Sequence, residues 1–352
     1  MSAASLRLPV SSSQLETDGT TDAGSGKRKL RKDSMLTRRQ FVERAAIAAA
    51  ALALPKPGAA QAGGPAPMFI SLNGALTRGV SGADKVRLAA RTGYGGVDWD
   101  FGPARTAGLD ATKALFAETK VRPTIVNLPM ARPLPFGGEQ AAFAEALKVL
   151  ADDAAFIGGV VCRKLMLVLS PLGAVPKVDY RKAVVERLSL IAEILQKSNL
   201  RLGLEFLGPL YMRQPRPDDN PPREPFIWTL PETVALAKEC GPNMGVVLDV
   251  WHWHHSGGTI QEILDAGARI VHVHISDAKP APPEDVRDNQ RVMPGEGSID
   301  LVGFLQALKK AGYADGVSPE PLGRVPETMS AEEGARLGLE TTTAVMRKAG
   351  VL

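Results

Sequence analysis

From Met68 onward, short apolar runs alternate with longer segments whose apolar residues recur at helical spacing. The short runs predict strands at 68–73, 95–99, 121–127, 163–169, 200–206, 244–249, 269–275 and 316–321. The longer segments predict helices at about 83–92, 109–119, 138–156, 179–197, 231–239, 259–266, 299–311 and 331–348. This part of the chain is therefore expected to alternate strand and helix eight times.

Two of the helices carry clear boundary signals. The apolar stripe of the helix at 179–197 consists of Val184, Leu188, Ile191 and Leu195. Asp179 is a favourable residue for capping its N-terminus. Another helix is predicted to end at Lys309-Lys310-Ala311-Gly312, because lysines in a last turn and a following glycine favour helix termination.

Eight strand–helix units favour a parallel sheet covered by helices, and eight is the number that closes a (β/α)8 barrel. The competing architecture is an open, doubly wound α/β sheet. Such a sheet is expected to carry a glycine-rich phosphate loop after its first strand, whereas this chain continues with Asn73-Gly74-Ala75. We therefore predict a single α/β barrel domain at 63–352.

Two further segments precede the barrel. Residues 1–34 are polar and of low complexity, which predicts a disordered extension. Residues 35–62 contain Arg38-Arg39-Gln40-Phe41, an apolar run at 45–54 and Ala60-Gln61-Ala62, an order that resembles a cleaved twin-arginine signal peptide. The twin-arginine machinery and a periplasmic or otherwise exported location are then expected. An uncleaved anchor or a chance amphipathic segment is the alternative, and the start at Met1 or Met35 stays open.

Residues 1–62 and the predicted barrel differ in net charge. Residues 1–62 hold 10 of the 42 Lys and Arg residues and 5 of the 38 Asp and Glu residues, so the remainder has 32 basic and 33 acidic side chains. A nearly neutral barrel argues against general nucleic-acid binding. The two cysteines, Cys162 and Cys240, form no CxxC motif and are expected to be buried thiols.

Candidate chemistry concentrates at the carboxyl ends of the last four strands, where the active sites of such barrels gather. Glu205, Asp249, His274 and Glu320 end or follow these strands. Three carboxylates would repel one another inside an apolar barrel unless a cation joined them. This oxygen-rich set predicts one divalent metal ion, Mn²⁺ first, with Mg²⁺, Co²⁺ or Zn²⁺ as alternatives.

For other residues near these strand ends, structural roles are expected or are as plausible as binding roles. His272 points the same way as His274 but lies one layer deeper, so we expect a hydrogen-bonded core histidine. His254 and His255 follow a strand end and are expected in a loop. Trp99, which ends the second strand with Asp98, fits either the pocket wall or the core.

Several ordered segments resemble the xylose isomerase-like barrel superfamily, and within it the sugar phosphate isomerase/epimerase group. They are Gly203-Leu204-Glu205, Leu248-Asp249-Val250-Trp251-His252, His272-Val273-His274-Ile275-Ser276-Asp277, Pro294-Gly295-Glu296-Gly297 and Pro319-Glu320. The resemblance covers about residues 68–349. It implies that Glu205, Asp249, His274 and Glu320 bind the metal and that Glu205 and Glu320 also act as the acid/base pair.

The resemblance further implies a sugar substrate and a contact to one of its hydroxyl groups from His252. Asp277 and Trp99 are further candidates for contacts to the substrate, and Asp98 is expected beside Trp99 at the pocket. The bound metal would act as a Lewis acid while one glutamate removes an α-proton and the other returns it through an enediolate. Related epimerases place an arginine six residues after the metal-binding histidine, where this chain has Pro280. Arg287 and Arg291 are candidates to replace it.

The predicted function is a metal-dependent isomerase or epimerase of an unphosphorylated sugar or keto-sugar, because sugar phosphates are scarce outside the cytoplasm. A lyase of the inosose dehydratase or 3-keto-glycoside type is the main alternative. A metal-dependent nuclease and a non-catalytic sugar-binding barrel are weaker ones. The long segment at 207–230 is expected to form a lid or a partner-binding loop, and a homo-oligomer is left open.

Overall fold

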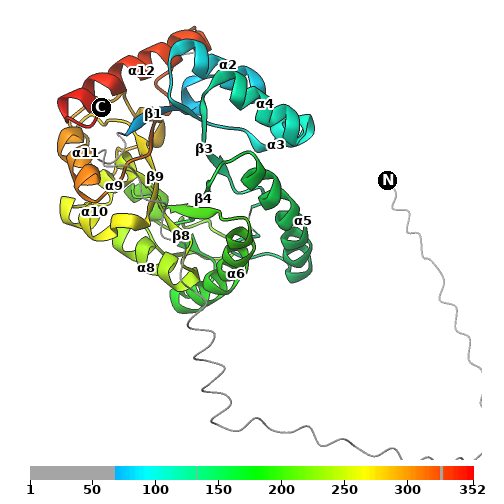
Figure 1. The fold of residues 1–352 in the computed structure, drawn as a ribbon. Coiled ribbons are helices and arrows are strands. Elements are labelled where there is room, and N and C mark those ends of the chain that lie inside the picture. Colours follow the sequence, from blue (N-terminus) through cyan, green and yellow to red (C-terminus); the bar gives the residue numbers. More distant parts are fainter. Residues whose placement is uncertain (1–67, 133, 326–327) are drawn as a thin grey trace, which may run out of the picture. The chain divides into compact units, whose positions relative to one another are not determined.

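The computed structural model describes residues 68–132, 134–325 and 328–352. Eight parallel strands close a barrel in the order in which they follow one another along the chain, and helices cover its outside (Figure 1). The predicted (β/α)8 barrel is therefore confirmed. The extension and signal peptide predicted at 1–34 and 35–62 lie outside the described residues.

Each barrel strand lies within its predicted range. The strands are β1 (Phe69–Leu72), β2 (Gly96–Asp98), β3 (Arg122–Asn127), β4 (Lys164–Val168), β6 (Arg201–Glu205), β8 (Met244–Asp249), β9 (Ile270–Ile275) and β10 (Gly316–Pro319). Every pairing is parallel, and β10 pairs with β1 to close the barrel. Because helices cover the outside and side chains fill the inside, every residue of β8 and β9 is buried.

The eight predicted helices are present with small shifts at their ends. They are α2 (Gly82–Thr92), α4 (Leu109–Thr119), α5 (Gln140–Gly159), α6 (Lys177–Lys197), α8 (Leu230–Cys240), α10 (Ile260–Ala266), α11 (Leu301–Lys310) and α12 (Ala331–Lys348). The cap predicted at Asp179 is wrong. Pro176 caps α6, its carbonyl accepting from the Tyr180 amide, so Asp179 lies in the first turn. There its charge still favours the helix dipole.

Three short helices were not foreseen by hydrophobic periodicity: α3 (Phe101–Ala107), α7 (Leu210–Arg213) and α9 (Val250–His255). Asp249 starts α9, because its side chain accepts hydrogen bonds from the amides of Trp251 and His252. The expectation that His254 and His255 lie in a loop is therefore wrong; both belong to this helix.

The segment 207–230 is anchored at its far end. Its strand β7 (Glu224–Pro225) pairs antiparallel with β5 (Leu172–Gly173), and the Phe226 amide donates to the Pro171 carbonyl at 2.7 Å. Phe226 is fully buried against Tyr180, with ring centroids 4.7 Å apart. The remainder of the segment, including α7, is held between this anchor and the end of β6.

Both cysteines are buried free thiols, as predicted. Burial raises the pKa of the Cys240 thiol to about 12, so this side chain is protonated at neutral pH. Within the described ranges, no helix combines the length and apolar character needed to cross a membrane.

Candidate metal centre

Four acidic or imidazole side chains meet at the carboxyl-terminal rim of the barrel. Glu205 is the last residue of β6, Asp249 is the last of β8, His274 lies in β9 and Glu320 follows β10. One ligand atom from each of the four lies within 4.8 Å of the others. We call these four residues the rim cluster. The structure thus brings together all four side chains that the strand ends predicted.

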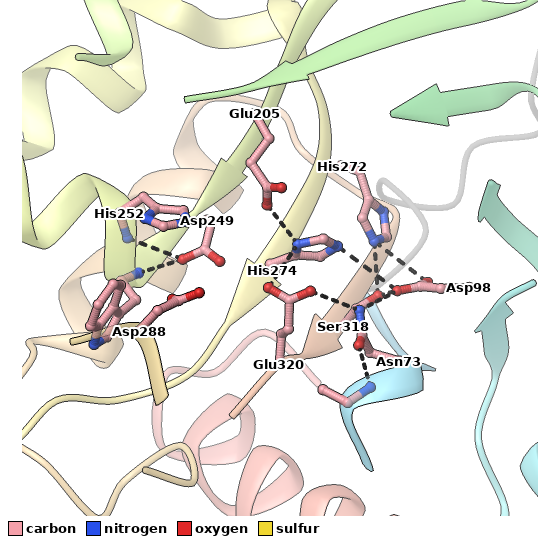
Figure 2. A network of polar contacts seen from close by, with 12 residues as sticks. Asn73, Asp98, Glu205, Asp249, His252, His272, His274, Asp288, Ser318 and Glu320 are labelled. Atoms are coloured by element: carbon pink, nitrogen blue, oxygen red, sulfur yellow. Dashed lines mark hydrogen bonds and ion pairs between the residues drawn. The ribbon is translucent and has the colours of Figure 1, made fainter. Parts of the chain in front are cut away.

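The rim cluster is withdrawn from solvent. The exposed fractions of its side chains are 6% for Glu205, 1% for Asp249, 1% for His274 and 17% for Glu320. Figure 2 shows Glu205 and Glu320 on opposite sides of the His274 ring. The Nδ1 atom of His274 lies 2.9 Å from Glu205 Oε1 and 3.4 Å from Glu320 Oε2. One imidazole nitrogen is therefore aimed between two carboxylates that come from opposite sides.

Burial and charge shift the titration of these groups in opposite directions. Burial, together with the nearby Glu320 and Asp249, raises the pKa of Glu205 to about 7 despite the opposing effect of His274. Burial alone would lower the pKa of His274, but Glu320 and Glu205 raise it well above its usual value. Three carboxylates that share one imidazole form a group with surplus negative charge, and a divalent cation fits such a group.

Arg291 supplies further positive charge to the rim cluster. Its Nη1 atom lies 2.6 Å from Asp249 Oδ2 and 3.2 Å from Glu320 Oε2, and the side chain is almost fully buried. Asp288 holds the other side of the guanidinium at 2.7 Å. Burial would raise the pKa of Asp249, but Arg291 holds it well below its usual value. Of the two arginines that the sequence left open, Arg291 is the one at the site.

Arg287 lies elsewhere. Its guanidinium stacks over the Tyr211 ring at 5.1 Å and donates to the carbonyls of Glu284 and Val286. Both arginines come from the long loop after β9, so no strand-end pattern distinguishes them. The only sequence signal for Arg291 is its spacing of three residues from Asp288, which becomes an ion pair in the folded loop.

A second group of polar residues lies beside the rim cluster (Figure 2). It consists of Ser71, Asp98, His272 and Ser318, which we call the inner cluster. Asp98 Oδ1 accepts from the hydroxyls of Ser71 and Ser318, at 2.8 and 2.9 Å, and Asn73 Nδ2 lies 3.0 Å from Oδ2. His272 Nε2 lies 2.8 Å from the Ser318 hydroxyl. His272 is thus the hydrogen-bonded core histidine that the sequence predicted.

The two clusters share His274. Its Nε2 atom faces Asp98 Oδ2 at 3.9 Å, while Nδ1 faces Glu205 and Glu320. Asp98, His272 and His274 also bring ligand atoms within 4.8 Å of one another. The sequence carried no signal for the hydroxyl groups that donate to Asp98, because Ser71 and Ser318 lie 27 and 220 positions away along the chain.

A cavity of about 440 Å³ opens onto the rim cluster. Glu205, Glu320, His252 and Trp99 line it, and so do Leu207 and Met212 from the segment predicted as a lid. His252 Nε2 lies 3.2 Å from Arg291 Nη2, and burial lowers the His252 pKa to about 4. Trp99 combines both roles considered for it, because its buried ring also packs edge-on against Phe116.

Asp277 has a different environment from the one expected for a substrate contact. Its oxygens accept hydrogen bonds from four backbone amides, those of Ala278, Gly295, Gly297 and Ile299. The side chain is buried and does not line the cavity. These contacts do not support the predicted contact to substrate; they make Asp277 the residue that organises the loop following β9.

Comparison with known proteins agrees with this geometry. Residues 86–344 match the family described as xylose isomerase-like TIM barrel. The chain belongs to this family. It therefore has the barrel fold shared by sugar isomerases and epimerases.

Individual relatives are more distant. The inosose isomerase of Bacillus licheniformis is 31% identical over 174 residues, which span 49% of this chain and 58% of that enzyme. A xylose isomerase domain protein from Alicyclobacillus acidocaldarius superposes with a TM-score of 0.71 at 28% identity, covering 80% of this chain and 99% of its own. The IolI protein, solved with a bound zinc atom, gives a TM-score of 0.66 at 24% identity, covering 80% and 99%.

Proposed function

We propose that this protein is a divalent-metal-dependent isomerase or epimerase that moves a proton next to a carbonyl group of an unphosphorylated sugar or keto-sugar. The observation that carries the proposal is the rim cluster, in which His274 Nδ1 lies between the carboxylates of Glu205 and Glu320 and Asp249 brings a third carboxylate within 4.8 Å. The 31% identity to an inosose isomerase supports the reaction class, although the match spans 58% of that enzyme.

Glu205, Asp249, His274 and Glu320 would hold the metal. When bound, the ion would supply Lewis-acid polarisation of a carbonyl oxygen. Carboxylate-rich sites favour Mn²⁺ or Mg²⁺, and the zinc in the IolI protein keeps Zn²⁺ as an alternative. The direction of His274 supports this assignment, because its Nδ1 atom points into the group of carboxylates.

The proton transfers fall to the two glutamates. Glu205 and Glu320 approach His274 Nδ1 from different strands, and both line the cavity in which a substrate would lie. A glutamate carboxyl group beside the substrate can accept a proton from carbon and return it. One glutamate would remove the proton and the other would return it to the opposite face or to the neighbouring carbon.

The lining of the cavity favours an uncharged substrate. Its acidic side chains include Asp98, Asp100 and Asp288. Two of its cations already have carboxylate partners, since Lys85 Nζ lies 2.7 Å from Asp100 and Arg291 binds Asp249. The third lining cation, Arg132, is exposed. A phosphate group would therefore meet more carboxylates than unpaired cations.

The test is solvent-deuterium incorporation, followed by mass spectrometry, into unphosphorylated ketoses, inososes and 3-keto-glycosides incubated with the Mn²⁺-loaded protein. We expect label next to the carbonyl group of at least one substrate, and isomerised product. Label accompanied by loss of water or of a glycosidic group would identify the lyase alternative. Absence of label from protein shown to hold metal would overturn the proposal and favour a binding module.

We also propose that residues 35–62 direct export through the twin-arginine machinery to the periplasm. The support is the order of Arg38-Arg39, the apolar run and Ala60-Gln61-Ala62. Replacing both arginines by lysine should abolish export of the full chain in a bacterial host. Unchanged export would contradict the proposal.

A further inference from the structure

A second cavity, of about 530 Å³, lies behind the wall of the first. It is lined by α7 and the end of α9 and by the proline-rich insertion at 279–283. Two of these, α7 with the residues before it and α9, also contribute to the lining of the catalytic cavity. Leu207, Met212 and His252 face the catalytic side, whereas Leu210, Arg213 and His255 face the second cavity.

The charge of this second cavity is one-sided. Arg213 and Lys279 line it, and none of its described lining residues is a carboxylate. Within the described ranges, neither cation has an ion-pair partner. The Arg213 guanidinium lies over the Trp228 ring at 5.2 Å, and its buried Nε atom has no hydrogen-bond acceptor. Burial lowers the Arg213 pKa without an opposing carboxylate, which is costly for a cation without a counterion.

The carboxylates nearest in sequence do not neutralise the cavity. Glu284 and Asp285 follow Pro283 but are exposed and do not line it. The oxygens of Asp277 are taken by four backbone amides. The positive charge of Arg213 and Lys279 therefore remains available to a ligand.

Two imidazoles add polar atoms to the same wall. His255 packs against Trp251 with ring centroids 4.5 Å apart, and its buried Nε2 atom has no partner. His254 is its exposed neighbour on α9. Burial lowers the pKa of His255 to about 4, so its neutral ring can donate one hydrogen bond at neutral pH.

We propose that the second cavity binds an oxyanion, a phosphate or carboxylate group held by Arg213 and Lys279. Arginine matches such groups with paired N–H donors, and lysine adds a point charge. A bound oxyanion would tie α7 to α9 and to the insertion. Gly208 already packs against the His252 carbonyl, so this binding would also fix the wall of the catalytic cavity.

The first experiment titrates the full-length, metal-free protein with inorganic phosphate, and separately with citrate, by isothermal calorimetry. The test variant is Arg213→Gln with Lys279→Gln, and Arg216→Gln, an exposed arginine in the same segment, is the matched control. We expect saturable binding to the wild type and the control and a loss of about tenfold or more in the double variant. Tighter binding of phosphate would indicate a phosphate ligand, and tighter binding of citrate would indicate a carboxylate ligand. No saturable binding of either anion, or equal affinity in the double variant, would overturn the proposal.

A second experiment uses only the wild-type protein, so its result does not depend on whether the variants fold. Phenylglyoxal modifies arginines in the wild-type protein, and mass spectrometry locates the products with and without the bound anion. Protection of Arg213 but not of Arg216 is expected. Protection confined to Arg132, an exposed arginine that lines the catalytic cavity, would place the anion there and contradict the proposal.

Discussion

The rim cluster and the inner cluster are neighbours, and both are built from buried acids and histidines, yet they differ in how their charges are balanced. In the inner cluster, hydroxyl and amide donors satisfy Asp98, and His272 pairs with Ser318. In the rim cluster, three carboxylates depend on His274 and on Arg291, which reaches two of them. A buried carboxylate whose hydrogen bonds come from neutral donors has a structural role. A cluster with surplus negative charge is suited to bind a cation.

His274 connects the two environments. Its Nδ1 atom faces the rim carboxylates and its Nε2 atom faces Asp98. A metal-binding histidine commonly directs its second nitrogen toward a carboxylate, which fixes the ring orientation. The inner cluster is therefore expected to act on the metal only through the orientation of this ring.

The largest expected effect comes from removing a proton-transfer group. Glu205→Gln and Glu320→Gln should each lower the rate of deuterium exchange by about 10²- to 10⁴-fold, because an amide cannot act as the acid/base group. Metal affinity should also fall. Glu284→Gln, at an exposed carboxylate, is the matched control and should leave both quantities unchanged. An unchanged rate of deuterium exchange in both variants would show that the two glutamates do not transfer the proton.

Arg291→Gln should destabilise the metal-free protein by about 3–5 kcal/mol, since it leaves buried Asp249 and Glu320 without their cation. Thermal unfolding with and without Mn²⁺ measures the effect. Mn²⁺ should raise the Tm of the variant more than that of the wild type, because it replaces the missing positive charge. Arg287→Gln is the control. A Tm equal to that of the wild type without metal would mean that the rim carboxylates do not need Arg291.

Asp98→Asn tests the connection through His274. We expect metal affinity to fall by about 10- to 100-fold while the fold is retained, because the amide still accepts hydrogen bonds but no longer attracts the His274 N–H as a carboxylate does. Calorimetric titration with Mn²⁺ measures this. Unchanged affinity would show that the two clusters act independently.

Asp277→Asn should have the smallest effect on catalysis. Its amide group would face two of the four backbone N–H donors, costing about 1–3 kcal/mol of stability. Chemical denaturation should register this loss, with KM for the sugar unchanged. A raised KM at unchanged stability would restore Asp277 to the substrate site.

The fold and the rim cluster were predictable because both depend on local order along the chain. Alternating apolar runs place each strand, and in a parallel barrel all strand ends meet at one rim. Glu205, Asp249, His274 and Glu320 could therefore be grouped without knowing any contact. Asp249 is also a favourable capping residue and marks the start of α9, a signal that hydrophobic periodicity does not contain.

Residues that depend on loop conformation could not be placed in the same way. Arg291 reaches Asp249 only because the loop after β9 folds back over the rim. Its spacing of three residues from Asp288 indicates a local ion pair and carries no information on Asp249. Asp277 was expected to contact the substrate, but the backbone amides of Gly295 and Gly297 donate hydrogen bonds to its oxygens. Such contacts join residues about 20 positions or more apart and follow no period.

The most direct test of the central claim is a crystal structure of the Mn²⁺-soaked protein, with the ion located by its anomalous scattering. We predict a single Mn²⁺ peak surrounded by Glu205, Asp249, His274 Nδ1 and Glu320, with Arg291 moved away from Asp249. A peak on Asp98, His272 and His274, or no peak at the rim from protein that holds the metal in solution, would contradict this account.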